Sequence, residues 1–130
     1  MLAQSLQLQL FNYLFTEFSR LDVPVIKTKD LDQELSYPFI AMQGISDSVQ
    51  GFTFDSFGGN PTVTIHIWGV EDNVLDNDEL NSRVQSILLN DIELDGYQLY
   101  APQININETT VQETNQSLSH VVMNVEYQAH

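Results

Sequence analysis

The sequence is 130 residues long and 42% hydrophobic, which predicts one domain, residues 1–130, with a hydrophobic core of its own. Eighteen acidic residues face four basic ones, and the net charge of −14 argues against binding to nucleic-acid phosphates or anionic membranes. Because the chain has no cysteine, it has no disulfide, no thiolate nucleophile and no cysteine zinc site.

The first predicted element is a helix from Leu2 to Leu21, which Asp22 and Pro24 end. Its apolar residues recur at helical spacing and form a broad face that suits packing on a sheet. They are Leu2, Leu6, Leu10, Leu14 and Phe18, with Phe11 and Phe15 beside them. The stretch lacks a basic n-region and a small-residue cleavage site, and polar residues interrupt it too often for a membrane span. We therefore expect a soluble, intracellular protein.

Short strands follow this helix. The letters "VPVI" predict a short strand, residues 27–36 a polar loop, and Tyr37 to Ile45 a strand that starts at a proline. Phe52 and Phe54 then alternate with polar residues, before the turn at 58–61, "GGNP".

A strand from Thr62 to Trp68 is the clearest element, because apolar and polar residues alternate strictly along it. One face carries Val63, Ile65 and Ile67, and the other carries Thr62, Thr64, His66 and Trp68.

A second helix is predicted over residues 74–90, with Asn90 as its stop. Its apolar stripe consists of Leu80, Val84, Ile87 and Leu88. Asp76 and Glu79 have the spacing of a capping box, and acidic groups suit the positive end of a helix.

The last third of the chain predicts strands joined by tight turns. Asp95-Gly96 is a turn, Ile104 and Ile106 alternate with asparagines, and a hairpin turns near residues 114–116, where both faces are polar. The final strand carries Val121, Met123, Val125 and Tyr127 on one face. The predicted fold is α+β: a mostly antiparallel sheet with the N-terminal and second helices packed on one face, and a projecting C-terminal hairpin.

No catalytic group stands out in the sequence. The three histidines are His66, His120 and His130, and none lies in a serine-nucleophile motif. We predict that His66, which lies mid-strand between two isoleucines, has a structural role. The protein is expected not to be an enzyme.

Cofactor and metal motifs are also weak. Acidic residues cluster from Glu71 to Glu79, but Val74 and Leu75 stand where a calcium loop needs oxygen donors, so a weak divalent site is left open and no metal ligand is assigned. Gly58-Gly59 has no following lysine and no helix, so no phosphate cradle and no cofactor is expected.

Interface residues are better candidates than catalytic ones. Phe52, Phe54 and Phe57 flank a glycine-rich turn, and Trp68 lies on the less apolar face of its strand. Phe52 and Phe54 fit an edge strand of the core as well as burial against another subunit. The polar hairpin tip is the second candidate contact. Its residues are Glu113, Thr114, Asn115 and Gln116.

The ordered blocks "YPFIAMQG", "GFTFDSFGGNPTVTIHIWG", "DELNSRVQSILLN", "LDGYQL" and "SLSHVVMNVEY" resemble the tail terminator proteins of long-tailed bacteriophages, also called tail completion or head-to-tail joining proteins. The resemblance spans residues 1–127 and contains no catalytic motif.

The resemblance implies a structural virion protein at the head-tail junction, present in the host cytoplasm during assembly. Such a subunit forms a hexameric ring on the finished tail tube, stops tube growth and presents the head-joining surface, and DNA passes through its lumen. The implied partners are further copies of the chain, the tail tube protein and a head completion or connector protein. A closed ring needs two different patches on each subunit.

Two other classes remain open. A head completion protein or connector stopper has a similar size and fold. An acidic DNA mimic that inhibits a DNA-binding enzyme fits the charge, although the acids are scattered through loops rather than regularly spaced. Large net charge also serves solubility alone.

Overall fold

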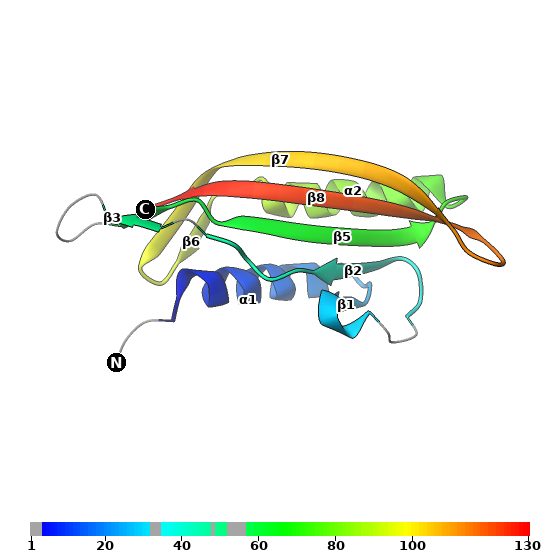
Figure 1. The fold of residues 1–130 in the computed structure, drawn as a ribbon, viewed down its shortest axis with the longest axis horizontal. Coiled ribbons are helices and arrows are strands. Elements are labelled where there is room, and N and C mark those ends of the chain that lie inside the picture. The colour runs from blue at the N-terminus through cyan, green and yellow to red at the C-terminus, as the bar shows by residue number, and fades with distance from the viewer. Residues whose placement is uncertain (1–3, 32–34, 48, 52–56) are drawn as a thin grey trace.

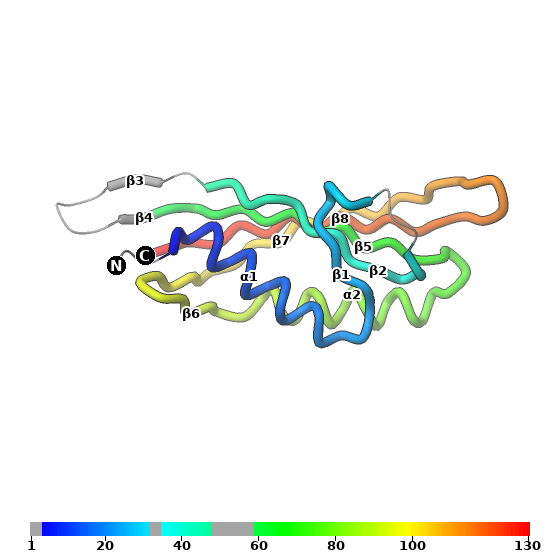
Figure 2. The backbone as a smooth tube through the Cα atoms, turned by 90° about the horizontal axis from the view of Figure 1, so that it is seen from below, coloured from blue at the N-terminus to red at the C-terminus, as the bar shows by residue number. Residues whose placement is uncertain are grey.

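The computed structural model describes residues 4–31, 35–47, 49–51 and 57–130. In these residues eight strands form a long, twisted sheet, and two α-helices lie along one of its faces (Figures 1 and 2). In chain order the elements are α1 (Leu6–Ser19), β1 (Val25–Lys27), a 3-10 turn (Thr28–Asp30), β2 (Phe39–Met42), β3 (Val49–Gly51), β4 (Phe57–Gly59), β5 (Thr62–Val70), α2 (Val74–Leu88), β6 (Ile92–Leu94), β7 (Tyr97–Gln112) and β8 (Ser117–Ala129). The predicted α+β class is confirmed.

The sheet is built around β8, which pairs with β7 along one edge and with β5 and then β4 along the other. The full path runs β1-β2-β5-β8-β4-β3, with β7 beside β8 and β6 beside β7. Among the strands that the structure describes, only β1 and β2 are parallel neighbours, and every other pair is antiparallel. At the end of the molecule where the β7–β8 hairpin projects, the strand order is therefore β1-β2-β5-β8-β7.

Helix α1 forms because a capping serine starts it and an apolar stripe anchors it. The Ser5 side chain accepts a hydrogen bond from the Leu8 backbone N–H at 3.2 Å, which satisfies one free donor of the first turn. The buried stripe agrees with the prediction and consists of Leu6, Leu10, Leu14 and Phe18. The predicted start at Leu2 lies outside the described residues.

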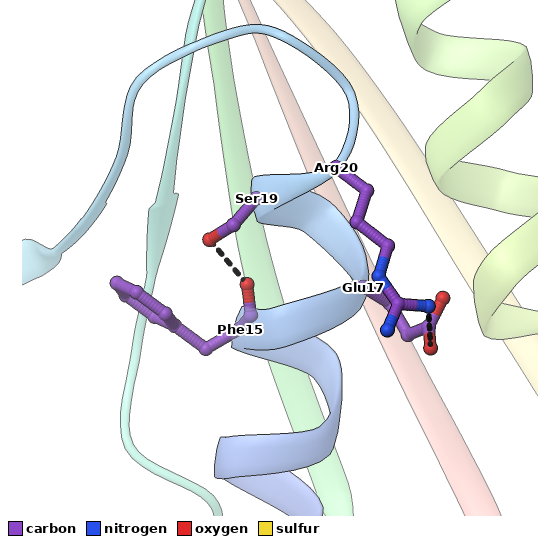
Figure 3. A network of polar contacts seen from close by, with 4 residues as sticks. All are labelled: Phe15, Glu17, Ser19 and Arg20. Atoms are coloured by element: carbon purple, nitrogen blue, oxygen red, sulfur yellow. Dashed lines mark hydrogen bonds and ion pairs between the residues drawn. The ribbon is translucent and has the colours of Figure 1, made fainter.

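The last turn of α1 is closed by its own side chains (Figure 3). The Ser19 hydroxyl donates to the Phe15 carbonyl at 2.7 Å, and Arg20 pairs with Glu17 at 3.2 Å. Asp22 then adopts a positive φ of 60°, a conformation that reverses the chain toward β1. The predicted helix end at Asp22 is thus close to the observed one at Ser19.

Helix α2 buries Leu80, Val84 and Leu88 as predicted, but the predicted capping box is wrong. The helix begins at Val74 with Asn73 at the cap position, so Asp76 lies inside the first turn. The physical reason is a contact outside the helix: the Asn77 side-chain amide donates to the Val70 carbonyl at 2.7 Å and holds the first turn against the end of β5. The acidic charge of Asp76 still lies at the positive end of the helix.

The core lies between the helices and the inward face of β5 and β8. Residues 63, 65 and 67 of β5 pair with residues 125, 123 and 121 of β8, and all six side chains are buried, as their alternation predicts. Each such burial contributes roughly 1.5–3 kcal/mol. Tyr127 joins the layers, because its hydroxyl donates to the Leu88 carbonyl at the end of α2 at 2.6 Å.

Both predicted C-terminal hairpins are present. Asp95 and Gly96 connect β6 to β7, and Gly96 has the positive φ of 83° that the tight turn requires. Residues 113–116 connect β7 to β8, and the Glu113 N–H donates to the Gln116 carbonyl at 2.9 Å. Neither described helix is long and apolar enough to cross a membrane.

Candidate interaction surfaces

Five rings follow one another across the face of the sheet opposite the helices, called here the outer face. Their centroids are 5.5 Å apart from Tyr37 to Phe39, 6.5 Å from Phe39 to Trp68, 3.8 Å from Trp68 to His120 and 5.1 Å from His120 to His66. The strand register produces this order, because β2 places Phe39 and β8 places His120 directly opposite Trp68. Aromatic pairs of this kind contribute about 0.5–1.5 kcal/mol each beyond their buried area.

The two histidines in this stack share a defined hydrogen-bond chain. Nε2 of His66 contacts Oε1 of Gln43, an acceptor, so this nitrogen donates. Nδ1 of His66 then accepts from Nε2 of His120 at 2.9 Å. Burial lowers the pKa of both rings, and the neighbouring His66 lowers the pKa of His120 further. This neutral, stacked pair fits the predicted structural role of His66.

Trp68, one of the predicted interface residues, is half-buried within this stack. Its indole Nε1 is buried and has no hydrogen-bond partner among the described residues. Much of the ring therefore packs against its own subunit, and only the remaining exposed part can contact a second molecule.

The predicted hairpin tip, Glu113 to Gln116, is fully on the surface. It lies at the end of the β7–β8 hairpin, whose part beyond the end of β5 is called here the arm (Figure 1). The β7 side chains from Asn105 to Thr110 are also exposed. The hairpin tip and the ring stack lie at the same end of the molecule, because Trp68 pairs with His120 near the start of β8. Burial raises the pKa of Tyr37, and the negative charge of Glu113 raises it further.

An apolar pair that is not among the predicted interface residues lies at this end as well. Val74 is 66% exposed and Leu75 is 85% exposed, at the start of α2. The Glu71 N–H donates to the Ser117 carbonyl at 2.9 Å, which ties this segment to the base of the arm. The sequence could have indicated this exposed pair, because neither residue belongs to the apolar stripe of α2.

The predicted phenylalanine patch falls mostly on residues that the structure does not describe. Phe52 and Phe54 lie outside the described residues. The backbone of Phe57 belongs to β4 and pairs with Gly51 of β3. The choice between a core strand and a subunit contact for these residues stays a prediction.

Acidic residues do not converge on a metal site in the described part of the chain. No group of three His, Asp or Glu side chains suited to a metal is found there. The cluster from Glu71 to Glu79 is spread along the exposed start of α2, where Glu79 pairs with Arg83 at 2.7 Å. A polar hollow on the outer face is lined by Thr62, Gln103, Ile104, Asn105, Asn124 and Glu126.

Comparison with known proteins gives a likeness of fold. No protein-family model matches the sequence, and no curated protein matches it. Among solved structures, the chain is similar to one described as "Virion of native gene transfer agent (GTA) particle", with a TM-score of 0.65 and 9% sequence identity. The similarity covers 96% of this chain and 94% of that chain. The two therefore share an α+β fold over nearly their whole lengths.

Proposed function

We propose that this protein is a structural component of a virion that caps the finished tail tube of a long-tailed phage as a ring. In this role it stops tube growth and provides the surface to which the head joins, and DNA passes through its lumen. The observation that carries the proposal is the near full-length fold similarity to a chain of a virion particle. The ordered sequence blocks that resemble tail terminators point the same way.

The distribution of surfaces supports a ring subunit. Among the described strands, β7 and β1 have unpaired outer edges on opposite sides of the sheet, whereas the hairpin tip and the exposed Val74-Leu75 pair lie at one end along the strands. A subunit that stands with its strands along the ring axis uses its sides for neighbouring copies and its end for the tube or the head. The partners in this arrangement are further copies of the chain, the tail tube protein and a head completion or connector protein.

The proposed role needs no catalysis and no cofactor. The histidine pair, which is the most chemically distinctive group on the outer face, is bonded to Gln43 and stacked on Trp68. The excess acidic charge suits a ring through which DNA moves, because like charges do not bind each other.

A depletion experiment tests the proposal. Particles assembled without this protein are expected to accumulate separate heads and overlong tails, and adding the purified protein to finished tails is expected to restore joining. Normal tail length with a defect confined to DNA-filled heads would instead assign it to the head side, as a connector stopper.

The predicted phenylalanine contact has its own test. Phe54→Ser combined with Phe57→Ser is expected to impair ring formation and tail joining, because a subunit contact loses two apolar groups. Unimpaired rings and joining would remove these residues from the interface.

A further inference from the structure

At the end of the sheet that carries the β7–β8 hairpin tip, the outer edges of β7 and β1 have no strand partner among the described residues. On β7, β6 covers only Tyr97 to Leu99, and no described strand pairs with the same edge from Gln103 to Gln112. At the opposite side, β1 ends the strand path, and within the described residues its outer edge has no strand partner. Open edges carry unpaired backbone N–H and C=O groups that template pairing with another strand.

The β7 edge carries little of the usual protection against such pairing. Proteins that stay monomeric shield an edge with lysines, prolines, bulges or short strands. From Gln103 to Gln112 the sequence "QININETTVQ" holds no lysine or proline and one charge, Glu108. The single register shift of β7 lies before this stretch, between Tyr100 and Gln103.

The strand directions allow the two edges to meet. β1 runs parallel to β2, β2 antiparallel to β5, β5 antiparallel to β8, and β8 antiparallel to β7. Consequently β1 and β7 run in opposite directions. When copies are related by rotation about an axis along the strands, β7 of one copy meets β1 of the next as an antiparallel pair, and the sheet continues around the ring.

The two edges also lie at the same level along the strands. Following the register across the sheet, Val25 is in line with Glu108 and Lys27 with Ile106. All four residues lie on the helix side of the sheet: Val25 packs against the core, the Lys27 ammonium lies 5.6 Å from the Phe11 ring centroid, and Ile106 and Glu108 pair with inward-facing residues of β8.

The side chains at this level are complementary. Ile106 is 46% exposed and Val25 is half-buried, so each supplies apolar surface at its edge. Lys27 and Glu108 are both exposed and carry opposite charges. In an antiparallel pair, residues directly opposite have Cβ atoms about 4.5–5.5 Å apart and diagonal neighbours remain within reach of long side chains.

We propose that the contact between neighbouring copies of this chain is β-strand addition, in which β7 of one copy pairs antiparallel with β1 of the next and Glu108 meets Lys27. This rests on the proposed function in that it names the lateral contact of the proposed ring. The contact uses two different edges of each subunit, which is what a closed head-to-tail ring requires.

Engineered cysteines test the contact directly, because the natural sequence contains none. The double variant Lys27→Cys with Ile106→Cys joins two positions at the same level, and it is expected to oxidise into a ladder of covalent oligomers that ends at the ring size. Each single variant is expected to give no ladder. A dimer formed by Ile106→Cys alone would show that two β7 edges pair with each other and would overturn the proposal.

Charge reversal gives a second readout in which net charge and the specific contact predict opposite results. Glu108→Lys lowers the net negative charge, so general repulsion between subunits predicts stronger assembly. The proposed contact predicts weaker assembly, by about tenfold or more in the concentration at half assembly, because two lysines then meet. Adding Lys27→Glu to Glu108→Lys restores the opposite pair and is expected to restore assembly.

Glu93→Lys is the matched control, because Glu93 is an exposed strand residue on β6, away from this level of the edge. It is expected to leave assembly unchanged or strengthened. Rings that form normally in native mass spectrometry but neither cross-link through positions 27 and 106 nor respond to Glu108→Lys would overturn the edge contact without overturning the ring itself. A chain that stays monomeric at every concentration and on tail tubes would overturn both.

Discussion

Removing the hydroxyl of Tyr127 is the sharpest single test of how α2 is fixed to the sheet. Tyr127 is 0% exposed, and its hydroxyl donates to the carbonyl of Leu88, the last residue of α2, at 2.6 Å. Tyr127→Phe keeps the ring and removes only this donor. The buried carbonyl then loses its partner, which costs about 1–3 kcal/mol.

For a chain of this length, 1 kcal/mol corresponds to about 4 °C in Tm, so the expected loss is about 4–12 °C in a calorimetric or circular-dichroism melt. Tyr100→Phe is the control: Tyr100 is 41% exposed, and a surface change of this kind stays within about 0.5 kcal/mol. Equal melting of Tyr127→Phe and the natural protein would refute the bond between β8 and the end of α2.

Alkaline unfolding reports on the same group. Burial raises the pKa of Tyr127 far above its ordinary value, and the neighbouring Tyr13 raises it further. Because the folded-state pKa is raised, the stabilisation is fully present below about pH 10 and is lost as the unfolded chain ionises above it. Urea unfolding between pH 9 and pH 11 (values chosen around the ordinary pKa of about 10) is expected to show this loss in the natural protein, and a smaller loss in Tyr127→Phe.

Three further outcomes are expected. Because the folded-state pKa values of His66 and His120 are lowered, their contribution to stability is present above about pH 6.5 and is lost as the pH falls below it. His120→Gln should flatten this dependence of the unfolding free energy on pH in urea unfolding, and an unchanged slope would contradict the lowered pKa values. Gly69→Ala places a Cβ against the Asn77 amide and is expected to lower the free energy of unfolding by about 1–3 kcal/mol, and by less when Asn77→Ala is also present. Equal losses with Asn77 and with Asn77→Ala would argue against this clash. Replacing residues 113–116 by a two-residue Asn-Gly turn should leave Tm nearly unchanged and reduce tail joining, whereas intact joining would exclude the arm tip as a contact.

Local patterns were sufficient to predict much of this fold. The alternation in β5 and β8 identified both of their faces, and the stripe from Leu6 to Phe18 identified α1. These signals are local because a strand or helix repeats its buried positions every two or every three to four residues. The turn at Asp95-Gly96 was readable for a similar reason, since glycine tolerates the required positive φ.

Features that depend on distant partners were not readable. The first turn of α2 is set by the bond from Asn77 to Val70, so the spacing of Asp76 and Glu79 was misleading. The ring stack joins Phe39, Trp68 and His120 from three strands and appears only once their register is known. The open β7 edge likewise follows from how short β6 is, which no local pattern reports.

Electron microscopy of tail tubes assembled in the presence of this protein tests the central claim most directly. The account predicts a single ring of this chain at one end of each tube, with tube elongation arrested once the ring is in place. Tubes that continue to grow and carry none of the chain at either end would contradict it.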